Sequence, residues 1–355
     1  MKLKQIKKIL VIRTDRIGEV LLTTPVITAL KEAHPDAKVS MMVKAEVRAL
    51  VEDNPNISEI IEYQGQGKGR GDPDSKSGPR QGGVPVGVQV TKLRSSRLLW
   101  LQAFRFANFL KAKRFDAVII VNPKKEFHLA AFLAGIPIRV GFDRKWGFLL
   151  THRVKDLKFE AKKHEVEYNL DLVRALGIEP SDKRPVLLVR EKGQFSPELD
   201  FLNKPTRPLV ALHPCTSNPL KMWPKEHFAR LGDLLFENGY NIAVVSGAEE
   251  MKSARETIGR MKHKPIDLAG KLPLKRFAQF LTGCRFLVSS DSGPVHIAAA
   301  VGTRVVALFG GQDPGSRPLR WAPYGEGHIV IARENIADIT PEEVVRAIIG
   351  VGPRV

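Results

Sequence analysis

Short apolar runs alternate along the whole chain with stretches of helical periodicity. We expect strands at residues 9–13, 38–43, 57–61, 116–121, 138–142, 209–213, 241–246, 286–289 and 305–309. We expect helices at residues 95–114, 225–238, 249–261, 274–282, 294–300 and 341–349. Strands that alternate with helices are typical of βαβ units, whose strands pair in parallel. The pattern therefore predicts an α/β fold with parallel sheets.

A proline-rich stretch divides the chain. Residues 180–208 contain five prolines and scattered charges, and proline breaks helices and disfavours central strands. We therefore predict a Rossmann-like N-terminal domain at residues 1–180, a linker at 181–207 and a Rossmann-like C-terminal domain at 208–355. Two such domains form a cleft between the carboxyl ends of their sheets, where ligands bind in open α/β folds.

A segment rich in Gly and Pro, residues 64–92, fits neither domain. It has few apolar anchors and cannot bury enough surface to offset the entropy of ordering, so we expect it to be flexible. Two interpretations are open, a basic lid that orders on substrate and a tolerated surface insertion. Asp72 and Asp74 have the spacing of an Asp-x-Asp metal motif, but no strand delivers them to a site. We therefore expect no metal site there.

The charge balance indicates an anionic partner. The chain has 56 Lys and Arg residues against 38 Asp and Glu, a formal net charge of +18. Nucleic acid, an anionic membrane surface and phosphorylated small molecules are partners of this kind, and a solvated basic surface with no single partner is the alternative. Aromatic residues make up only 7% of the chain, and it has no RNA-recognition or helix-turn-helix signature, which argues against nucleic acid.

Cysteine content and hydropathy bear on location. Cys215 and Cys284 are the only cysteines and lack metal-ligand spacing, which argues against a disulfide scaffold and fits a reducing cytoplasm. The apolar run at residues 9–12 is too short for the core of a signal peptide. No segment reaches the roughly 18 apolar residues of a membrane-spanning helix, so we expect any membrane contact to be peripheral.

The first candidate site follows the first expected strand, where residues 9–25 read ILVIRTDRIGEVLLTTP. Gly18 permits close backbone approach or positive φ, and the helix that starts beside it offers free N–H groups to an anion. One glycine does not make the three-glycine dinucleotide fingerprint, so NAD binding is not indicated. Asp15 and Glu19 stand where a general base is expected, and helix capping with dipole complementarity is the alternative for both.

The second candidate site, residues 212–224, reads LHPCTSNPLKMWP. Thr216 and Ser217 can donate hydrogen bonds to phosphate oxygens, and Lys221 supplies a positive charge. Trp223 has two interpretations, a stacking platform and a packing residue, of which the second is commoner.

The third candidate site, residues 286–300, reads FLVSSDSGPVHIAAA. A strand leads through Asp291, Ser292 and Gly293 into a helix rich in Ala. The amides of Ser292 and Gly293 at the helix start form a cradle for a diphosphate, and Asp291 can accept hydrogen bonds from sugar hydroxyls. His296 lies one turn into the helix, where a structural role and a ligand contact are both open.

The three motifs together resemble those of the heptosyltransferase family of lipopolysaccharide core synthesis. The matching segments are RTDRIGEVLLTTP, the pair HP and LKMWP separated by five residues, and SDSGPVH, in this order. FDAVII at residues 115–120 and LFGGQDP at 308–314 are also similar to family segments. The resemblance spans most of the chain.

The resemblance implies a GT-B fold with two Rossmann-like domains and an inverting glycosyl transfer without metal or other cofactor. The implied donor is ADP-L-glycero-D-manno-heptose, bound mostly by the C-terminal domain. The implied acceptor is the Kdo–lipid A inner core of lipopolysaccharide, or a heptose already on it. We therefore expect a cytoplasmic protein, peripheral on the anionic inner membrane. A transferase for another nucleotide sugar, and a non-catalytic polyanion-binding protein on this scaffold, are the alternatives.

The resemblance also implies roles for single residues. Glu19 matches the acid that acts as general base, although the family usually has Asp there, and Asp15 is a second candidate. Lys221 matches the lysine that holds the donor diphosphate. The remaining residues implied on the donor side are Thr216, Ser217, Asp291, Ser292, Gly293 and His296, with Glu249 or Glu250 at the adenosine ribose. Those on the acceptor side are Arg13, Arg16 and Gly18.

The expected helix at residues 95–114 has two interpretations. It carries Trp and Phe residues flanked by Arg and Lys, a composition typical of a helix that lies in a membrane interface. The commoner outcome for such a helix is packing against the N-terminal sheet.

Overall fold

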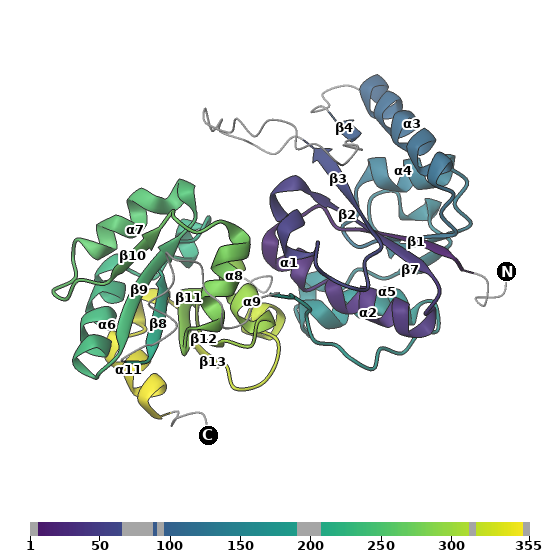
Figure 1. Cartoon of the computed structure of the whole chain (residues 1–355). Coiled ribbons are helices and arrows are strands. Elements are labelled where there is room, and N and C mark those ends of the chain that lie inside the picture. The colour runs from purple at the N-terminus through teal and green to yellow at the C-terminus, as the bar shows by residue number, and fades with distance from the viewer. Residues whose placement is uncertain (1–5, 66–87, 91–95, 190–206, 312–316, 351–355) are drawn as a thin grey trace. The chain divides into compact units, whose positions relative to one another are not determined.

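The computed structural model describes residues 6–65, 88–90, 96–189, 207–311 and 317–350 (Figure 1). It divides into two compact units, which are described separately. Unit 1 comprises residues 1–156 and 169–183, and unit 2 comprises residues 157–168 and 184–355. Most of the expected Gly-rich insertion, including Asp72 and Asp74, lies outside the described residues, as does most of the expected linker.

Unit 1 contains a parallel sheet with the strand order β4-β3-β2-β1-β5-β6-β7. Its strands are β1 (Lys8–Ile12), β2 (Lys38–Lys44), β3 (Glu59–Gly65), β4 (Val88–Val90), β5 (Ala117–Ile120), β6 (Ile138–Phe142) and β7 (His152–Val154). Its helices include α1 (Ile17–Leu21), α2 (Thr24–Ala33), η2 (Ala45–Leu50), α3 (Ser96–Lys113), α4 (Lys125–Leu133) and η3 (Gly147–Leu149). Helix α5 (Glu165–Arg174) begins in unit 2 and ends in unit 1.

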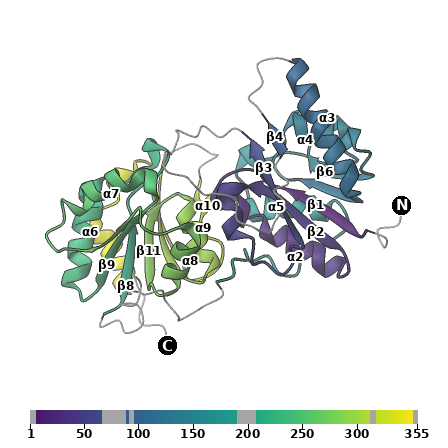
Figure 2. The same cartoon turned by 45° about the horizontal axis from the view of Figure 1, so that its top comes forward.

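Unit 2 contains a parallel sheet with the strand order β10-β9-β8-β11-β12-β13. Its strands are β8 (Leu209–His213), β9 (Asn241–Ser246), β10 (Ile266–Ala269), β11 (Phe286–Ser290), β12 (Arg304–Gly310) and β13 (Ile329–Arg333). Its helices include η4 (Lys158–Glu160), η6 (Pro219–Lys221), α6 (Lys225–Glu237), η7 (Ala248–Glu250), α7 (Met251–Ile258), α8 (Leu274–Thr282), α9 (Gly293–Ala300), α10 (Pro318–Trp321), η9 (Ile336–Asp338) and α11 (Pro341–Gly350). In Figure 2, α6 and α7 lie on one side of this sheet and α8 and α9 on the other.

The central strands are buried because their sequences are apolar on both faces. In β1 every residue after Lys8 is buried, and all four residues of β5 are buried. Continuous apolar runs of this kind are what a parallel strand covered on both faces requires. In each sheet the strand order reverses once, between β1 and β5 in unit 1 and between β8 and β11 in unit 2. Loops that leave the carboxyl ends of such strand pairs diverge, and ligand sites form there.

Trp223 anchors the core of unit 2 beneath the second sequence motif. The side chain is fully buried, its ring packs edge-on against Phe228 with centroids 4.8 Å apart, and its Nε1 donates to the Ile339 carbonyl at 2.9 Å. A buried Trp whose N–H finds a partner loses no hydrogen bond on folding. Trp223 is therefore a packing residue.

The expected α/β architecture with parallel sheets is confirmed. The nine expected strands are present with shifts of a few residues at their ends, and the expected strand at residues 57–61 runs from Glu59 to Gly65. The prediction missed β4, β7, β10 and β13. All four are edge strands, and β4, β7 and β10 have only three or four residues, too short for a hydrophobic pattern to stand out.

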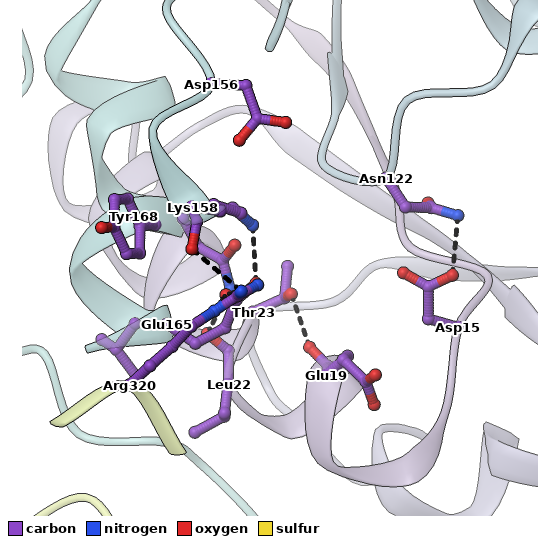
Figure 3. Close-up of polar contacts among 12 residues, drawn as sticks. Asp15, Glu19, Leu22, Thr23, Asn122, Asp156, Lys158, Glu165, Tyr168 and Arg320 are labelled. Carbon is purple, nitrogen blue, oxygen red and sulfur yellow. Dashed lines mark hydrogen bonds and ion pairs between the residues drawn. The ribbon is translucent and has the colours of Figure 1, made fainter. Parts of the chain in front are cut away.

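Residues 157–168 belong to unit 2, whereas the sequence-based boundary at residue 180 puts them in the first domain. The reason is a buried ionic cluster. Glu165 is 1% exposed and accepts from Lys158 Nζ at 2.6 Å and from Arg320 Nε at 2.9 Å (Figure 3). Removing a partner from a buried carboxylate is costly, so these contacts hold the segment to α10.

No helix within the described ranges has the length and apolar character needed to cross a bilayer.

We predict that Gly310→Ala destabilises unit 2. A Cβ at Gly310 would lie 2.5 Å from the Ile336 Cβ and 2.7 Å from the Ile336 backbone nitrogen, so the backbone of η9 must shift. Such overpacking costs about 1–3 kcal/mol. The matched control is Gly350→Ala, because a Cβ at that position meets nothing within 4 Å. Denaturant unfolding should show a lower midpoint for Gly310→Ala only, and equal midpoints would contradict the packing described.

Candidate functional site

The carboxyl ends of β1 and β5 carry a hydrogen-bonded polar group. Asn122 Oδ1 accepts from the Thr14 backbone N–H at 3.2 Å, and its Nδ2 donates to Thr14 Oγ1 and to Asp15 Oδ1, each at 3.1 Å. Figure 3 shows Asp15 turned toward Asn122. The loop after β1 is therefore held to the loop after β5 at the point where the strand order reverses.

Arg13 lies beneath this loop and is almost fully buried. Its Nε is 3.2 Å from Asp15 Oδ2, and its Nη1 donates to Asn169 Oδ1 at 3.5 Å. Asn169, fully buried on α5, donates in turn to the Leu22 carbonyl at the end of α1 at 3.0 Å. Arg13, expected on the acceptor side, thus braces the loop from within, whereas Arg16 is exposed.

Glu19 lies in α1 and is partly exposed. Its backbone carbonyl accepts from Thr23 Oγ1 at 2.8 Å, but within the described ranges its carboxylate makes no hydrogen bond or ion pair (Figure 3). Gly18 is buried inside the same helix and does not have positive φ, so that part of the expectation is wrong. Ordinary helical backbone angles therefore suffice at Gly18. Of the two acids, Asp15 is committed to neighbours and Glu19 is available to a ligand.

Lys124 brings a partly desolvated cation to the same edge. Its Nζ donates to Thr14 Oγ1 at 3.1 Å and lies 4.8 Å from the ring centroid of Tyr63 and 5.0 Å from that of Phe127. Burial lowers the pKa of its ammonium, and the nearby Glu126 carboxylate opposes this shift. A desolvated ammonium gains more from an anionic ligand than a hydrated one does.

In unit 2, β8 and β11 end in a chain of buried polar groups. His213 Nδ1 is 3.1 Å from Ser289 Oγ, which is 2.9 Å from Ser292 Oγ. On its other side His213 Nε2 is 3.8 Å from Glu250 Oε2. This interaction with His213 is the main cause that lowers the pKa of Glu250, against the opposing effect of burial. At 3.8 Å the contact is too long for a good hydrogen bond.

Lys221 and Asp291 form an ion pair at the start of α9. The Nζ–Oδ2 distance is 2.5 Å, and the side chains are 23% and 11% exposed. Asp291 is followed by Ser292 and then Gly293, the first residue of α9, whose free amides carry the positive end of the helix dipole. Four residues expected at the donor thus lie together at one edge of the unit 2 sheet.

The other residues expected at the donor are placed differently. Thr216 and Ser217 lie in the loop after β8, where Thr216 is partly exposed and Ser217 is exposed. Glu249 is exposed, whereas the neighbouring Glu250 faces His213. The structure thus gives different surroundings to the two candidates for the ribose contact, between which the sequence left the choice open.

His296 is buried inside α9 with 4% exposure. Burial lowers its pKa from the ordinary 6.5 to about 3, and the nearby His164 adds to this effect. A neutral, buried imidazole supplies no charge to a diphosphate. Of the two interpretations left open by the sequence, this geometry favours the structural one.

Comparison with known proteins identifies the family. The model of glycosyltransferase family 9 (heptosyltransferase) matches residues 103–344, more than half of the chain. The chain belongs to glycosyltransferase family 9. The predicted heptosyltransferase resemblance is therefore confirmed, and the chain is a glycosyltransferase.

Relatives and solved structures cover nearly the whole chain. Lipopolysaccharide heptosyltransferase 2 of Escherichia coli is 24% identical over 367 residues, covering 95% of this chain and 96% of that protein. The glycosyl transferase family 9 structure from Veillonella parvula has a TM-score of 0.78 at 23% identity, covering 98% and 97% of the two chains. The structure of Escherichia coli ADP-heptose lipopolysaccharide heptosyltransferase II has a TM-score of 0.73 at 23% identity, covering 96% and 98%. The expected GT-B fold with two Rossmann-like units is confirmed.

Sequence reasoning missed several polar residues. Asn122, Lys124, His213 and Ser289 lie at or beside strand ends, and Asn169 lies on α5. The rule that sites form at the carboxyl ends of strands beside the reversal of strand order points to Asn122 and Lys124, directly after the strand in FDAVII, and to His213 and Ser289. Asn169 carries no such signal, because its contacts with Arg13 and Leu22 join residues about 150 positions apart.

We predict that His296 makes the stability of unit 2 fall as pH falls. Because its pKa is lower in the folded than in the unfolded state, unfolding takes up a proton below about pH 6.5, and the loss grows until about pH 3. At about pH 5 the loss is about 2 kcal/mol. His296→Gln should remove this pH-dependent part, measured as the difference in denaturant midpoint between pH 7.5 and about pH 5. A variant whose midpoints run parallel to those of the unsubstituted protein would show that His296 is not the titrating group.

Proposed function

We propose that the chain transfers heptose from ADP-L-glycero-D-manno-heptose to the Kdo or heptose residues of the lipopolysaccharide inner core, with inversion and without a metal ion. Membership of family 9 supports the heptosyl transfer. The names of the two Escherichia coli proteins support the donor and acceptor classes, since one is called a lipopolysaccharide heptosyltransferase and the other an ADP-heptose lipopolysaccharide heptosyltransferase.

The observation that carries the donor assignment is the Lys221–Asp291 pair at the start of α9. The lysine is partly exposed, so a diphosphate can take the ammonium from Asp291 and accept hydrogen bonds from the amides of α9. As the glycosidic bond breaks, negative charge grows on the leaving diphosphate. A preorganised cation and a helix N-terminus stabilise that charge in the transition state. Asp291, released from the lysine, can accept hydrogen bonds from sugar hydroxyls.

The proposal assigns proton removal to Glu19. A general base takes the proton from the acceptor hydroxyl as the new bond to the sugar forms. The Glu19 side chain is partly exposed, and its carboxylate makes no hydrogen bond or ion pair in the described part of unit 1, whereas Asp15 is occupied by Arg13 and Asn122. Asp15, with Arg13 and Asn169, is proposed to position the loop that carries Glu19. Glu250, held by His213, is proposed to bind the adenosine ribose.

A donor screen tests the proposal as a whole. Turnover with ADP-L-glycero-D-manno-heptose and a truncated lipopolysaccharide acceptor is the expected result. Turnover only with another nucleotide sugar would move the chain to the alternative transferase. Salt-sensitive binding of polyanions, with neither transfer nor donor hydrolysis, would indicate the non-catalytic alternative.

We predict that Lys221→Ala weakens binding of ADP-heptose by about 1.5–3 kcal/mol, the range for a charge-assisted contact. The matched control is Lys225→Ala. Lys225 also forms an ion pair, with Glu256 at 2.6 Å, but begins α6 instead of facing α9. Calorimetric titration should show the loss for Lys221→Ala alone. An unchanged affinity would remove Lys221 from the donor site.

We predict that Glu19→Gln leaves ADP-heptose binding nearly intact and lowers turnover by about 100- to 10,000-fold, the usual scale for loss of a general base. Glu19→Asp should retain more activity than Glu19→Gln, because it keeps the carboxylate. Asp15→Asn is the control for the second acid of the loop. If Asp15→Asn abolishes turnover while Glu19→Gln does not, Asp15 is the base and Glu19 is not.

A further inference from the structure

Four neighbouring aromatic side chains of unit 1 remain at least partly exposed to solvent. Trp100 and Phe104 are one turn apart on α3 and are 52% and 58% exposed. Phe148 in η3 is 69% exposed, and Trp146 precedes it. The ring centroids of Trp100 and Trp146 are 6.3 Å apart, and those of Trp146 and Phe148 are 6.4 Å apart. These four residues, the aromatic patch, join α3 to the loop after β6.

Helix α3 already has a core-facing side that is distinct from the aromatic patch. Ala103, Phe106, Ala107 and Leu110 are buried, and all but Ala103 belong to the main apolar cluster of unit 1. The helix is therefore packed on unit 1, as the commoner interpretation of its sequence expected. Trp100 and Phe104 lie outside this core-facing side, where about half of each side chain stays exposed. Exposed aromatic clusters with polar surroundings mark interaction sites.

Basic residues lie beside the aromatic patch. The sequence of α3 contains four basic residues and no acidic one, and Arg105 is exposed beside Phe104. Lys125 Nζ lies 5.7 Å from the ring centroid of Trp146, and the exposed Lys145 precedes that residue. The acid of this loop, Asp143, is exposed as well, but the cations outnumber it.

The backbone conformation of the loop after β6 also indicates that the aromatic patch is held in place. Lys145 adopts a left-handed conformation with φ of 56°, which is uncommon for a long side chain without a local reason. Strained positions of this kind concentrate where a segment is held for function. Here the strained residue leads directly into Trp146.

We propose that the aromatic patch docks unit 1 on an anionic phospholipid bilayer. Trp and Phe side chains favour the boundary between headgroups and acyl chains. Each nearby Lys or Arg adds attraction to anionic headgroups that extends over about a Debye length. A protein partner would need acidic groups to match the cations and apolar groups to cover the aromatic rings, whereas an anionic bilayer presents both along its whole surface. Because the nearby cations outnumber the one exposed acid of the loop, we choose the bilayer over a protein as the partner of the aromatic patch.

Vesicle sedimentation of the full chain tests the proposal. Binding is expected to vesicles of phosphatidylcholine with phosphatidylglycerol, and to be much weaker to phosphatidylcholine alone. Trp100→Ala combined with Phe148→Ala should lower the partition coefficient at least roughly tenfold, since apolar contact with the interface is lost. The matched control is Phe159→Ala, a Phe that is 70% exposed but belongs to unit 2 and not to the aromatic patch. Its partition coefficient should stay unchanged.

Two further measurements separate the contribution of charge to vesicle binding from the insertion of the aromatic rings. Arg105→Glu with Lys145→Glu should weaken binding at low salt and make the remaining binding less sensitive to salt. Lipids brominated in the acyl chains should quench tryptophan fluorescence of the full chain, and Trp100→Phe with Trp146→Phe should abolish that quenching while binding persists. Binding without quenching, or quenching that survives this substitution, would overturn the proposal.

The competing occupant is a second copy of the chain. In that case sedimentation velocity without lipid would show self-association that Trp100→Ala with Phe148→Ala abolishes, and vesicle binding would be the same for both proteins. This outcome would also overturn the proposal. All substituted side chains are at least partly exposed, and the thermal transition of each variant serves as the check that it folds.

Discussion

Burial of the central strands on both faces governs the arrangement of each unit. A parallel strand covered by helices on both sides has little room for charged side chains along its length. Polar groups are therefore pushed to the strand ends, and the loops beside the reversal of strand order have the room to hold them. In unit 1 this edge carries Thr14, Asp15 and Asn122, and in unit 2 it carries His213, Ser289 and Asp291. Both sheets concentrate their chemistry in the same way.

At these edges the partners of each group decide what it can do. A buried acid or base that is already satisfied stabilises the loop, and a partly exposed one with an exchangeable partner can meet a ligand. Arg13 is of the first kind, since it is almost fully buried and contacts Asp15 and Asn169. Lys221, paired with Asp291 at a helix N-terminus, is of the second kind. In the proposed reaction, residues of the first kind therefore position the loop, and residues of the second kind contact the substrate.

Part of the net charge of +18 lies away from the strand ends, where a nucleotide sugar would not contact it. Lys221 and Lys124 stand at strand ends, but the cations of α3 and of the loop after β6 stand beside exposed aromatic rings. A small phosphorylated ligand has no use for Trp100 or Phe148. A lipid surface uses both the charge and the rings, and an enzyme whose proposed acceptor is a lipid-anchored glycan is most effective where that acceptor is held.

Most of the strands, and the loops expected to carry the chemistry, could be predicted from the sequence. Apolar runs and helical periodicity are local properties, so nine strands and the three motifs were readable without any contact, and the order of the motifs indicated the family. Which residues meet depends on the tertiary fold. It places residues 157–168 with unit 2 through Glu165 and Arg320, sets Glu250 against His213, buries His296 and joins Asn169 to the loop of Glu19. These outcomes depend on packing between segments far apart in the chain, and no local pattern encodes the distance between two side chains that folding brings together.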